Sequence, residues 1–305
     1  MKIGITFGAY CPLHQGHLDL IMRAKNENDK CVVIVGGRRH DRGGELLPLE
    51  KRFALVKRLF QGDQSIIVGL INNSDLGIDG SKTLANWKIW LQKVRDILEE
   101  NNLLADMYVY TWYVAEALYA ARIREICGEP VVLLDRQSNA VSGSKCRSEP
   151  FRYWRKITWP FRPFYTETIL VTGFDTRKTD LLAADVARYY SLVYTSNGAA
   201  AGGAENQATY SLSVCYPIFL MSADLPSFWQ SLCSGTSAVS RVKLNKVFTL
   251  CGSFDEYSSQ ITIIRNFRQY LEVKNVPLQV LSGDRRENFC IMKDYVSSIL
   301  ADCQL

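Results

Sequence analysis

Short apolar segments alternate with amphipathic segments along almost the whole chain of 305 residues. Leu18, Ile21 and Met22, for example, recur at the spacing of a helix face and are followed by an apolar run. In the first half of the chain this alternation predicts strands at residues 2–7, 31–35, 66–70, 107–110 and 131–134, and helices at residues 50–60, 87–98 and 115–126. Buried strands separated by helices are typical of a doubly wound parallel sheet, so we expect an α/β fold of Rossmann-like type.

The alternation is interrupted at residues 151–165, where two prolines stand among aromatic and basic residues. Such a segment is typical of a packed connector. Beyond it we expect strands at residues 169–171, 192–194, 216–221, 247–251 and 278–281, and helices at residues 179–190, 261–273 and 288–300. The length suits two buried cores, so we expect domains at residues 1–163 and 164–305. Residues 196–204, which are rich in small side chains, are expected to form a mobile surface loop or a degenerated site.

Charge and cysteine content exclude several classes of protein. The chain carries 36 Lys and Arg against 31 Asp and Glu, and its net charge of +5 suits anionic small molecules, or solubility alone, without a stripe for nucleic acid. Nine cysteines without a CxxC pair argue against a disulfide framework and a thiolate metal site, and favour a reducing compartment. No signal peptide and no apolar run of the roughly 20 residues that span a membrane are visible, so we expect a cytoplasmic protein without a membrane span.

The first predicted strand runs into the loop GAYCPLHQGH, residues 8–17, directly before a helix. In open parallel sheets, ligands bind beyond the carboxyl ends of the strands, where a helix amino terminus attracts phosphate. His14 and His17 are placed there to donate hydrogen bonds to a triphosphate and to stabilise the charge that grows on its bridging oxygen. Gly8 would let the backbone approach the nucleotide, and Tyr10 is expected to contact ATP beside it. The alternative is that His17 only caps the helix and His14 lies in an ordinary loop.

A second segment that could bind phosphate, VSGSKCR at residues 141–147, follows the last predicted strand of the first domain. The two segments together resemble the HxGH nucleotidylyltransferase superfamily. That resemblance implies that Ser142, Ser144, Lys145 and Arg147 bind the β- and γ-phosphates of ATP. It also implies direct attack of an acceptor phosphate on the α-phosphorus, with pyrophosphate leaving and no covalent intermediate. Mg²⁺ would then be carried mainly by the phosphates and water, with no protein metal site.

Further segments narrow the resemblance to the bacterial NadR-type family. They are the helix start at residues 50–52, the segment 87–90, the run SGSKCRSEPFRYWRKI at residues 142–157, and LSGDRRENF at residues 281–289. The family joins a nicotinamide mononucleotide adenylyltransferase to a ribosylnicotinamide kinase. The resemblance therefore implies ATP and nicotinamide mononucleotide as substrates, NAD as product and ribosylnicotinamide as a further ligand. No helix-turn-helix region precedes Met1, so DNA binding is not expected, and a homo-oligomer is left open.

Candidate contacts to the acceptor come from two places in the first domain. Trp87 and Trp90 could stack on the nicotinamide ring, although their spacing of three residues equally suits a buried helix face. Arg38 and Arg39 follow the second strand at the ligand edge of the sheet and could meet the incoming phosphate. A solvated loop is the alternative for this pair.

The second domain departs from the P-loop pattern G-x-x-x-x-G-K-[ST] of its family. Its loop, TGFDTRKT, keeps Gly173, Lys178 and Thr179 as candidate phosphate-binding residues. Thr172 and Arg177, however, stand where the pattern has its two glycines. An arginine at the second position should obstruct the wrapping of backbone amides around a phosphate.

The strand end FLMSAD at residues 219–224 departs in the same direction. The family carries two aspartates there, one residue apart; Asp224 matches the second and Ser222 replaces the first. We therefore expect weak or absent kinase activity, with the domain kept for packing, oligomerisation or nucleotide binding. Two rivals remain for the whole chain: an HxGH transferase for another acceptor, such as pantetheine phosphate or a sugar phosphate, and a nucleotide-sensing regulator with decayed sites.

Overall fold

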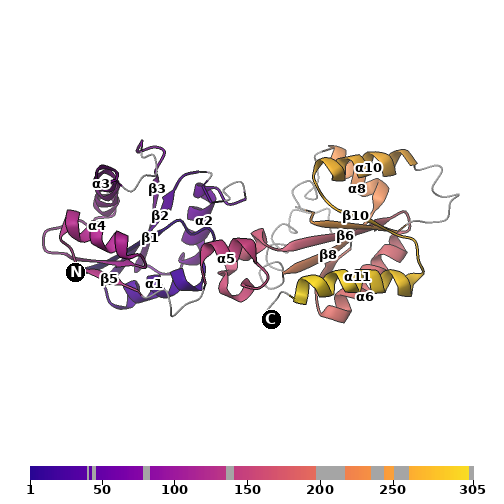
Figure 1. The fold of residues 1–305 in the computed structure, drawn as a ribbon, viewed down its shortest axis with the longest axis horizontal. Coiled ribbons are helices and arrows are strands. Elements are labelled where there is room, and N and C mark those ends of the chain that lie inside the picture. The colour runs from indigo at the N-terminus through magenta and orange to yellow at the C-terminus, as the bar shows by residue number, and fades with distance from the viewer. Residues whose placement is uncertain are drawn as a thin grey trace. The chain divides into compact units, whose positions relative to one another are not determined.

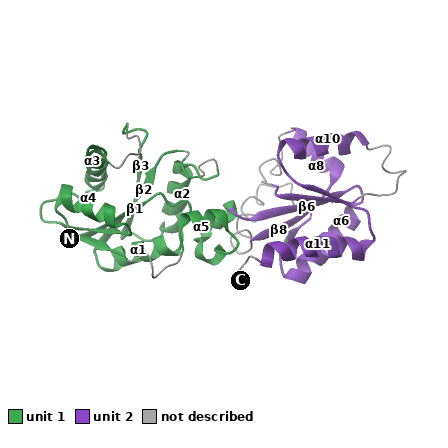
Figure 2. Cartoon of the chain, viewed as in Figure 1, with its two compact units in different colours: residues 1–164, 305 green, residues 165–304 purple. Residues whose placement is uncertain are grey.

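A computed structural model of the chain describes residues 1–39, 41–42, 46–77, 83–134, 141–196, 217–234, 244–250 and 261–301. The chain divides into two compact units between Phe164 and Tyr165 (Figure 2). Each unit contains a five-stranded parallel sheet with helices on both of its faces (Figure 1). The expected α/β architecture with two parallel sheets is therefore confirmed.

The sheet of the first unit has the strand order β3-β2-β1-β4-β5. Its strands are β1 (Lys2–Gly8), β2 (Lys30–Gly37), β3 (Ile66–Asn72), β4 (Val109–Val114) and β5 (Val131–Leu133). Its helices are α1 (Gln15–Asn26), α2 (Leu49–Leu59), α3 (Leu84–Glu100), α4 (Ala117–Cys127) and α5 (Gly143–Ser148), followed by the 3₁₀ turns η2 (Trp154–Lys156) and η3 (Trp159–Phe164). Because β1 pairs with β2 on one side and β4 on the other, the strand order reverses at β1, which is where open α/β sheets bind ligands.

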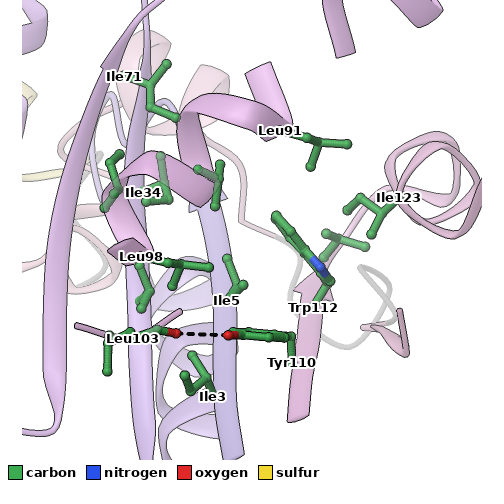
Figure 3. Close-up of a cluster of buried hydrophobic side chains, with 14 of the residues drawn as sticks. Ile3, Ile5, Ile34, Ile71, Leu91, Leu98, Leu103, Tyr110, Trp112 and Ile123 are labelled. Carbon is green, nitrogen blue, oxygen red and sulfur yellow. Dashed lines mark hydrogen bonds between the residues drawn. The ribbon is translucent and has the colours of Figure 1, made fainter. Parts of the chain in front are cut away.

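A hydrophobic core between this sheet and helices α3 and α4 holds the first unit together (Figure 3). Ile5 of β1 packs there with Leu91 of α3 and Ile123 of α4. The polar ends of this core have partners: the hydroxyl of Tyr110 donates to the carbonyl of Leu103 over 3.0 Å, and Nε1 of Trp112 donates to Glu129 (Figure 3). Helices α1 and α2 contact the sheet with buried apolar residues of their own, outside this cluster.

Strand β4 lies further along the chain than the apolar pattern predicts. We expected it at residues 107–110, but Met107 is 81% exposed and the strand spans Val109–Val114. Tyr110, Trp112 and Val114 alternate with their neighbours and turn one face toward the core. The strand is therefore set by its pairing with β1 and by the residues from Tyr110 onward, most of which are buried, rather than by the first apolar residues.

The sheet of the second unit has the strand order β10-β9-β6-β8-β7. Its strands are β6 (Glu167–Gly173), β7 (Val193–Thr195), β8 (Ile218–Asp224), β9 (Lys246–Leu250) and β10 (Leu278–Leu281). Helices α6 (Thr176–Tyr190) and α11 (Arg285–Ala301) cover one face, and α8 (Leu225–Ser234) and α10 (Ile261–Val273) cover the other (Figure 1). The small-residue segment expected at 196–204 lies outside the described residues from position 197 onward.

Candidate active site

The loop between β1 and α1 brings two imidazole rings together. His14 is the N-cap residue of α1, and its carbonyl accepts from the amides of His17 and Leu18 over 2.9 and 3.0 Å. The ring centroids of His14 and His17 are 3.8 Å apart, and the ring planes differ by 24°. His14 is 5% exposed, whereas His17 lines a cavity. The loop thus presents one histidine to the cavity and supports it with the other.

The connector after α5 supports this loop from behind. His14 forms an isolated antiparallel bridge with Ile157, and Thr158 donates from its amide and its hydroxyl to the carbonyl of Leu13 over 3.1 and 3.0 Å. Phe161 has no exposed surface and packs the same segment into the unit. The connector is therefore part of the site that carries the histidines.

Tyr10 lies behind the loop and does not line the cavity, although we expected it beside the nucleotide. Its ring is 1% exposed and meets His17 edge-on, with the centroids 5.1 Å apart. Burial raises the pKa of Tyr10 far above its ordinary value. A Cβ on Gly8 would lie 2.9 Å from the Tyr10 ring, so the glycine makes room for the tyrosine as well as lining the cavity. Both residues fix the loop that carries His17.

The second segment meets the first loop across more than a hundred residues of sequence. Arg147 donates from Nη1 to the carbonyl of Cys11 over 2.5 Å. Ser142 caps α5 by accepting from the amide of Lys145 over 3.3 Å, and its Oγ lies 2.9 Å from that of Ser144. The structure therefore brings the two segments together. Arg147 supports the first loop through this hydrogen bond, whereas Ser144 and Lys145 are exposed.

A cavity of about 420 Å³ lies at the carboxyl ends of β1, β2 and β4. Its lining includes His17 and an aromatic group of Phe7, Trp87, Trp90 and Tyr119. The Phe7 and Trp90 ring centroids are 4.8 Å apart. Trp87 is 9% exposed and belongs to the core as well as to the lining of the cavity.

The two arginines after β2 have different positions. Arg38 lines the cavity, whereas Arg39 is exposed and absent from the lining. The backbone carbonyl of Arg39 accepts from the amide of Leu49 over 3.2 Å. Arg42, which we did not single out, also lines the cavity. The basic wall therefore comes from Arg38 and Arg42.

Sequence reasoning missed four more residues around the cavity. Asp41, Asn86 and Glu116 line it, and Arg52 lies fully buried beside it. Glu116 follows β4 at the ligand edge of the sheet, but the rule that selected Arg38 did not reach it, because the predicted strand ended at residue 110. A different sequence feature could have indicated Arg52. It stands four residues before the apolar Val56 in a predicted helix, so both side chains lie on the same, buried face.

The first turn of α6 in the second unit binds a carboxylate of the chain itself. Asp175 caps the helix, with Oδ1 accepting from the amide of Lys178 over 3.1 Å and Oδ2 lying 3.2 Å from Lys178 Nζ. The hydrogen bond from that amide is the main reason why the pKa of Asp175 lies below its ordinary value. Thr179 is buried and donates to the carbonyl of Thr176 over 2.8 Å. The amide and ammonium of Lys178 and the hydroxyl of Thr179, which a phosphate would contact, thus have partners within the loop. This loop begins after Gly173, at the end of β6.

The altered acidic strand end has its own hydrogen-bond network. Ser222 is 1% exposed and donates to Oδ1 of Asp180, and its Oγ lies 2.9 Å from the hydroxyl of Tyr194. Burial raises the pKa of Tyr194 to about 12. Asp224 accepts from the amide of Ser227 over 2.9 Å, at the start of α8.

Within the part of the chain that the structure describes, no group of three or more His, Cys, Asp or Glu is arranged to hold a metal ion. None of the described helices is long and apolar enough to cross a bilayer.

Comparison with known proteins gives a family match within the first unit and similar folds over nearly the whole chain. The cytidylyltransferase-like family profile matches residues 5–149. The trifunctional NAD biosynthesis/regulator protein NadR of Escherichia coli (strain K12) is 26% identical over 200 residues, which is 62% of this chain and 47% of NadR, so the chain spans about half the length of this curated relative. A crystal structure of NadR in complex with NAD and AMP-PNP matches with a TM-score of 0.79 at 20% identity over 98% of this chain and 96% of that one. A second NadR structure, in complex with NR, matches with a TM-score of 0.77 at 20% identity over the same shares.

Proposed function

We infer, from the membership of residues 5–149 in the cytidylyltransferase-like family, that the first unit is a nicotinamide mononucleotide adenylyltransferase. It joins nicotinamide mononucleotide to the AMP part of ATP and releases pyrophosphate. The observation that carries this proposal is a cavity whose lining combines His17, the basic residues Arg38 and Arg42, and an aromatic group. The NadR relative, described as an NAD biosynthesis protein, supports the same assignment.

The paired histidines suit transfer without a covalent intermediate. His17 donates to the phosphate oxygens of ATP and stabilises the charge that grows between the α- and β-phosphates as pyrophosphate leaves. Mg²⁺ would be coordinated mainly by oxygens of the triphosphate and by water, without a dedicated protein cage, and would supply positive charge beside the leaving group. The rate then depends on how well the chain aligns the two phosphates.

The aromatic group suits a nicotinamide ring. Its pyridinium is a flat cation, and cations are attracted to the faces of tryptophan and other aromatic rings. The carboxylate of Glu116 lines the same cavity and adds an opposite charge, while Asn86 offers an amide to the carboxamide. Pantetheine phosphate and sugar phosphates lack a cationic ring and would leave this part of the lining unused.

The test is a competition among acceptors. The purified chain is incubated with Mg-ATP and equal concentrations of nicotinamide mononucleotide, nicotinate mononucleotide, phosphopantetheine and a sugar phosphate, and the products are identified by mass spectrometry. We expect NAD and pyrophosphate. Adenylylation of another acceptor in place of nicotinamide mononucleotide would overturn the substrate assignment, and binding without turnover would favour a regulator.

We further propose that the second unit phosphorylates ribosylnicotinamide weakly or not at all. The support is the Asp175 carboxylate at the start of α6 together with its contact to Lys178. The assay is label transfer from γ-labelled ATP to ribosylnicotinamide, with Lys178→Ala as the control for a contaminating kinase. Brisk transfer that disappears in the Lys178 variant would contradict the proposal.

A further inference from the structure

A buried arginine joins two loops that face the cavity. Arg52 of α2 has no exposed surface, and its Nη1 donates to the carbonyl of Ala9 over 2.8 Å. Its Nη2 donates to the carbonyl of Arg38 over 2.9 Å and to Oδ1 of Asp41 over 2.6 Å. Ala9 belongs to the loop with the histidines, while Arg38 and Asp41 belong to the loop after β2. A single guanidinium therefore contacts both loops.

The carboxylate of Asp41 completes the junction. Its Oδ2 accepts from the amide of Arg38 over 3.1 Å, while Oδ1 is held by Arg52. A Cβ on Gly37 would lie 2.7 Å from Oδ2, so a side chain at that position would displace the carboxylate. A buried guanidinium is stable only with an opposite charge and hydrogen-bond acceptors around it, and this arrangement provides both.

A second link ties the same two loops. The thiol of Cys11 donates to the carbonyl of Arg42 over 3.3 Å. Burial raises the pKa of Cys11, so the sulfur keeps its proton and remains a donor at neutral pH. The loop with the histidines and the basic wall are thus connected at Ala9 and at Cys11.

We propose that Arg52 and Asp41 are positioning residues that align the two reacting phosphates; the idea rests on the proposed function. His17 holds the α-phosphate side of ATP, and Arg38 and Arg42 line the wall that receives the acceptor phosphate. Direct transfer needs the attacking oxygen in line with the leaving one, and a misplacement of about 1 Å lowers the rate about a hundredfold. The planar fork of an arginine can reach three acceptors in fixed directions, which the single ammonium of a lysine cannot do.

The kinetic test uses two variants and a control in the full chain. Asp41→Asn removes the charge of a side chain that is 26% exposed, and Arg52→Lys keeps the charge but loses the fork. We expect kcat to fall about tenfold or more in both, with the KM for ATP within about threefold of wild type, because each substrate keeps its own contacts. The exposed Lys57→Ala on the same helix should match wild type. An unchanged kcat in folded Asp41→Asn would overturn the proposal.

Amide hydrogen exchange tests the junction independently of the substrate. In Asp41→Asn, peptides covering residues 9–17 and 37–42 should both exchange faster, whereas Lys57→Ala should change neither. Faster exchange in only one of the two peptides would refute the junction. If the wild-type chain made no NAD, the proposed function would fail, while the exchange result would still decide whether Arg52 and Asp41 hold the two loops together.

Discussion

His17 is the side chain on which the proposed chemistry depends most. Replacing it with alanine removes one donor to the developing phosphate charge, and loss of such a donor raises the barrier by on the order of 3 kcal/mol. We expect His17→Ala to lower kcat about a hundredfold while the circular dichroism spectrum stays that of wild type. A variant with wild-type kcat would mean that the histidine is structural.

Glu116 should decide between two closely related acceptors. Nicotinamide mononucleotide presents a cationic ring with a neutral amide, whereas nicotinate mononucleotide adds a carboxylate that Glu116 would repel. We expect Glu116→Gln to reduce the ratio of kcat/KM for the two acceptors about tenfold or more. Glu125→Gln, which alters an exposed carboxylate on the same helix, is the matched control and should keep the ratio. Equal ratios in all three proteins would rule out this role.

At the scale of residues, local signals were enough for some positions and not for others. His14, His17 and Ser142 stand in short contiguous segments whose flanking strand and helix indicate their place. Arg52 could not be selected in this way, because its acceptors lie 43, 14 and 11 residues away in the sequence. Tyr10 stands in the right loop, but which way its ring turns depends on packing against Gly8 and His17.

Among the elements, removing the cap at the start of α6 should lower the stability of the fold and strengthen the binding of ATP. Asp175→Ala removes the cap, which should lower the free energy of unfolding by about 0.5–2 kcal/mol. It also removes the carboxylate that competes with phosphate for the amide of Lys178. We therefore expect ATP binding to rise from about one to about two molecules per chain in calorimetry. Asp294→Ala, which removes another exposed carboxylate, is the control for the change in net charge. Lower stability without a second bound ATP would mean that Arg177, rather than Asp175, prevents nucleotide binding.

Acid should weaken the attachment of α1 to the turn before β3. Hydrogen bonds from Lys25 and then Ser65 lower the pKa of Asp63 from 3.8 to about 2. A depressed pKa in the folded state stabilises the protein above the ordinary value and ceases to do so as the pH falls from about 4 towards 2. Urea denaturation should show the gap between wild type and Asp63→Asn closing over that window. Asp106→Asn, an exposed carboxylate, is the control; a gap independent of pH would contradict the assignment.

The elements themselves were predicted best where the apolar period was long and uninterrupted. The helix at 261–273 and the strand at 278–281 have the predicted bounds. Helix α8 (Leu225–Ser234) was not predicted, although Asp224 before it and Pro226 in its first turn are typical of a helix start. Strand β4 was displaced because its register is set by pairing with β1, not by where the apolar residues begin.

For the whole molecule, the first unit should work without the second. Residues 1–164 contain a complete sheet, both phosphate-binding segments and the connector, so we expect them to make NAD with the kcat of the full chain. Residues 1–149, where the family match ends, lack Ile157 and Thr158 and should lose most of this activity while keeping the far-ultraviolet spectrum of a folded sheet. Equal turnover by both fragments would show that the connector does not support the loop.

The bridge between His14 and Ile157 also has a consequence for the order of events on the ribosome. Synthesis proceeds from the amino terminus at about 5–20 residues per second, so the histidine is made about 7 to 30 seconds before its partner. All five strands of the sheet have been translated by then. We therefore expect the loop that carries the histidines to reach its final arrangement only after the connector has emerged from the ribosome and has paired with it.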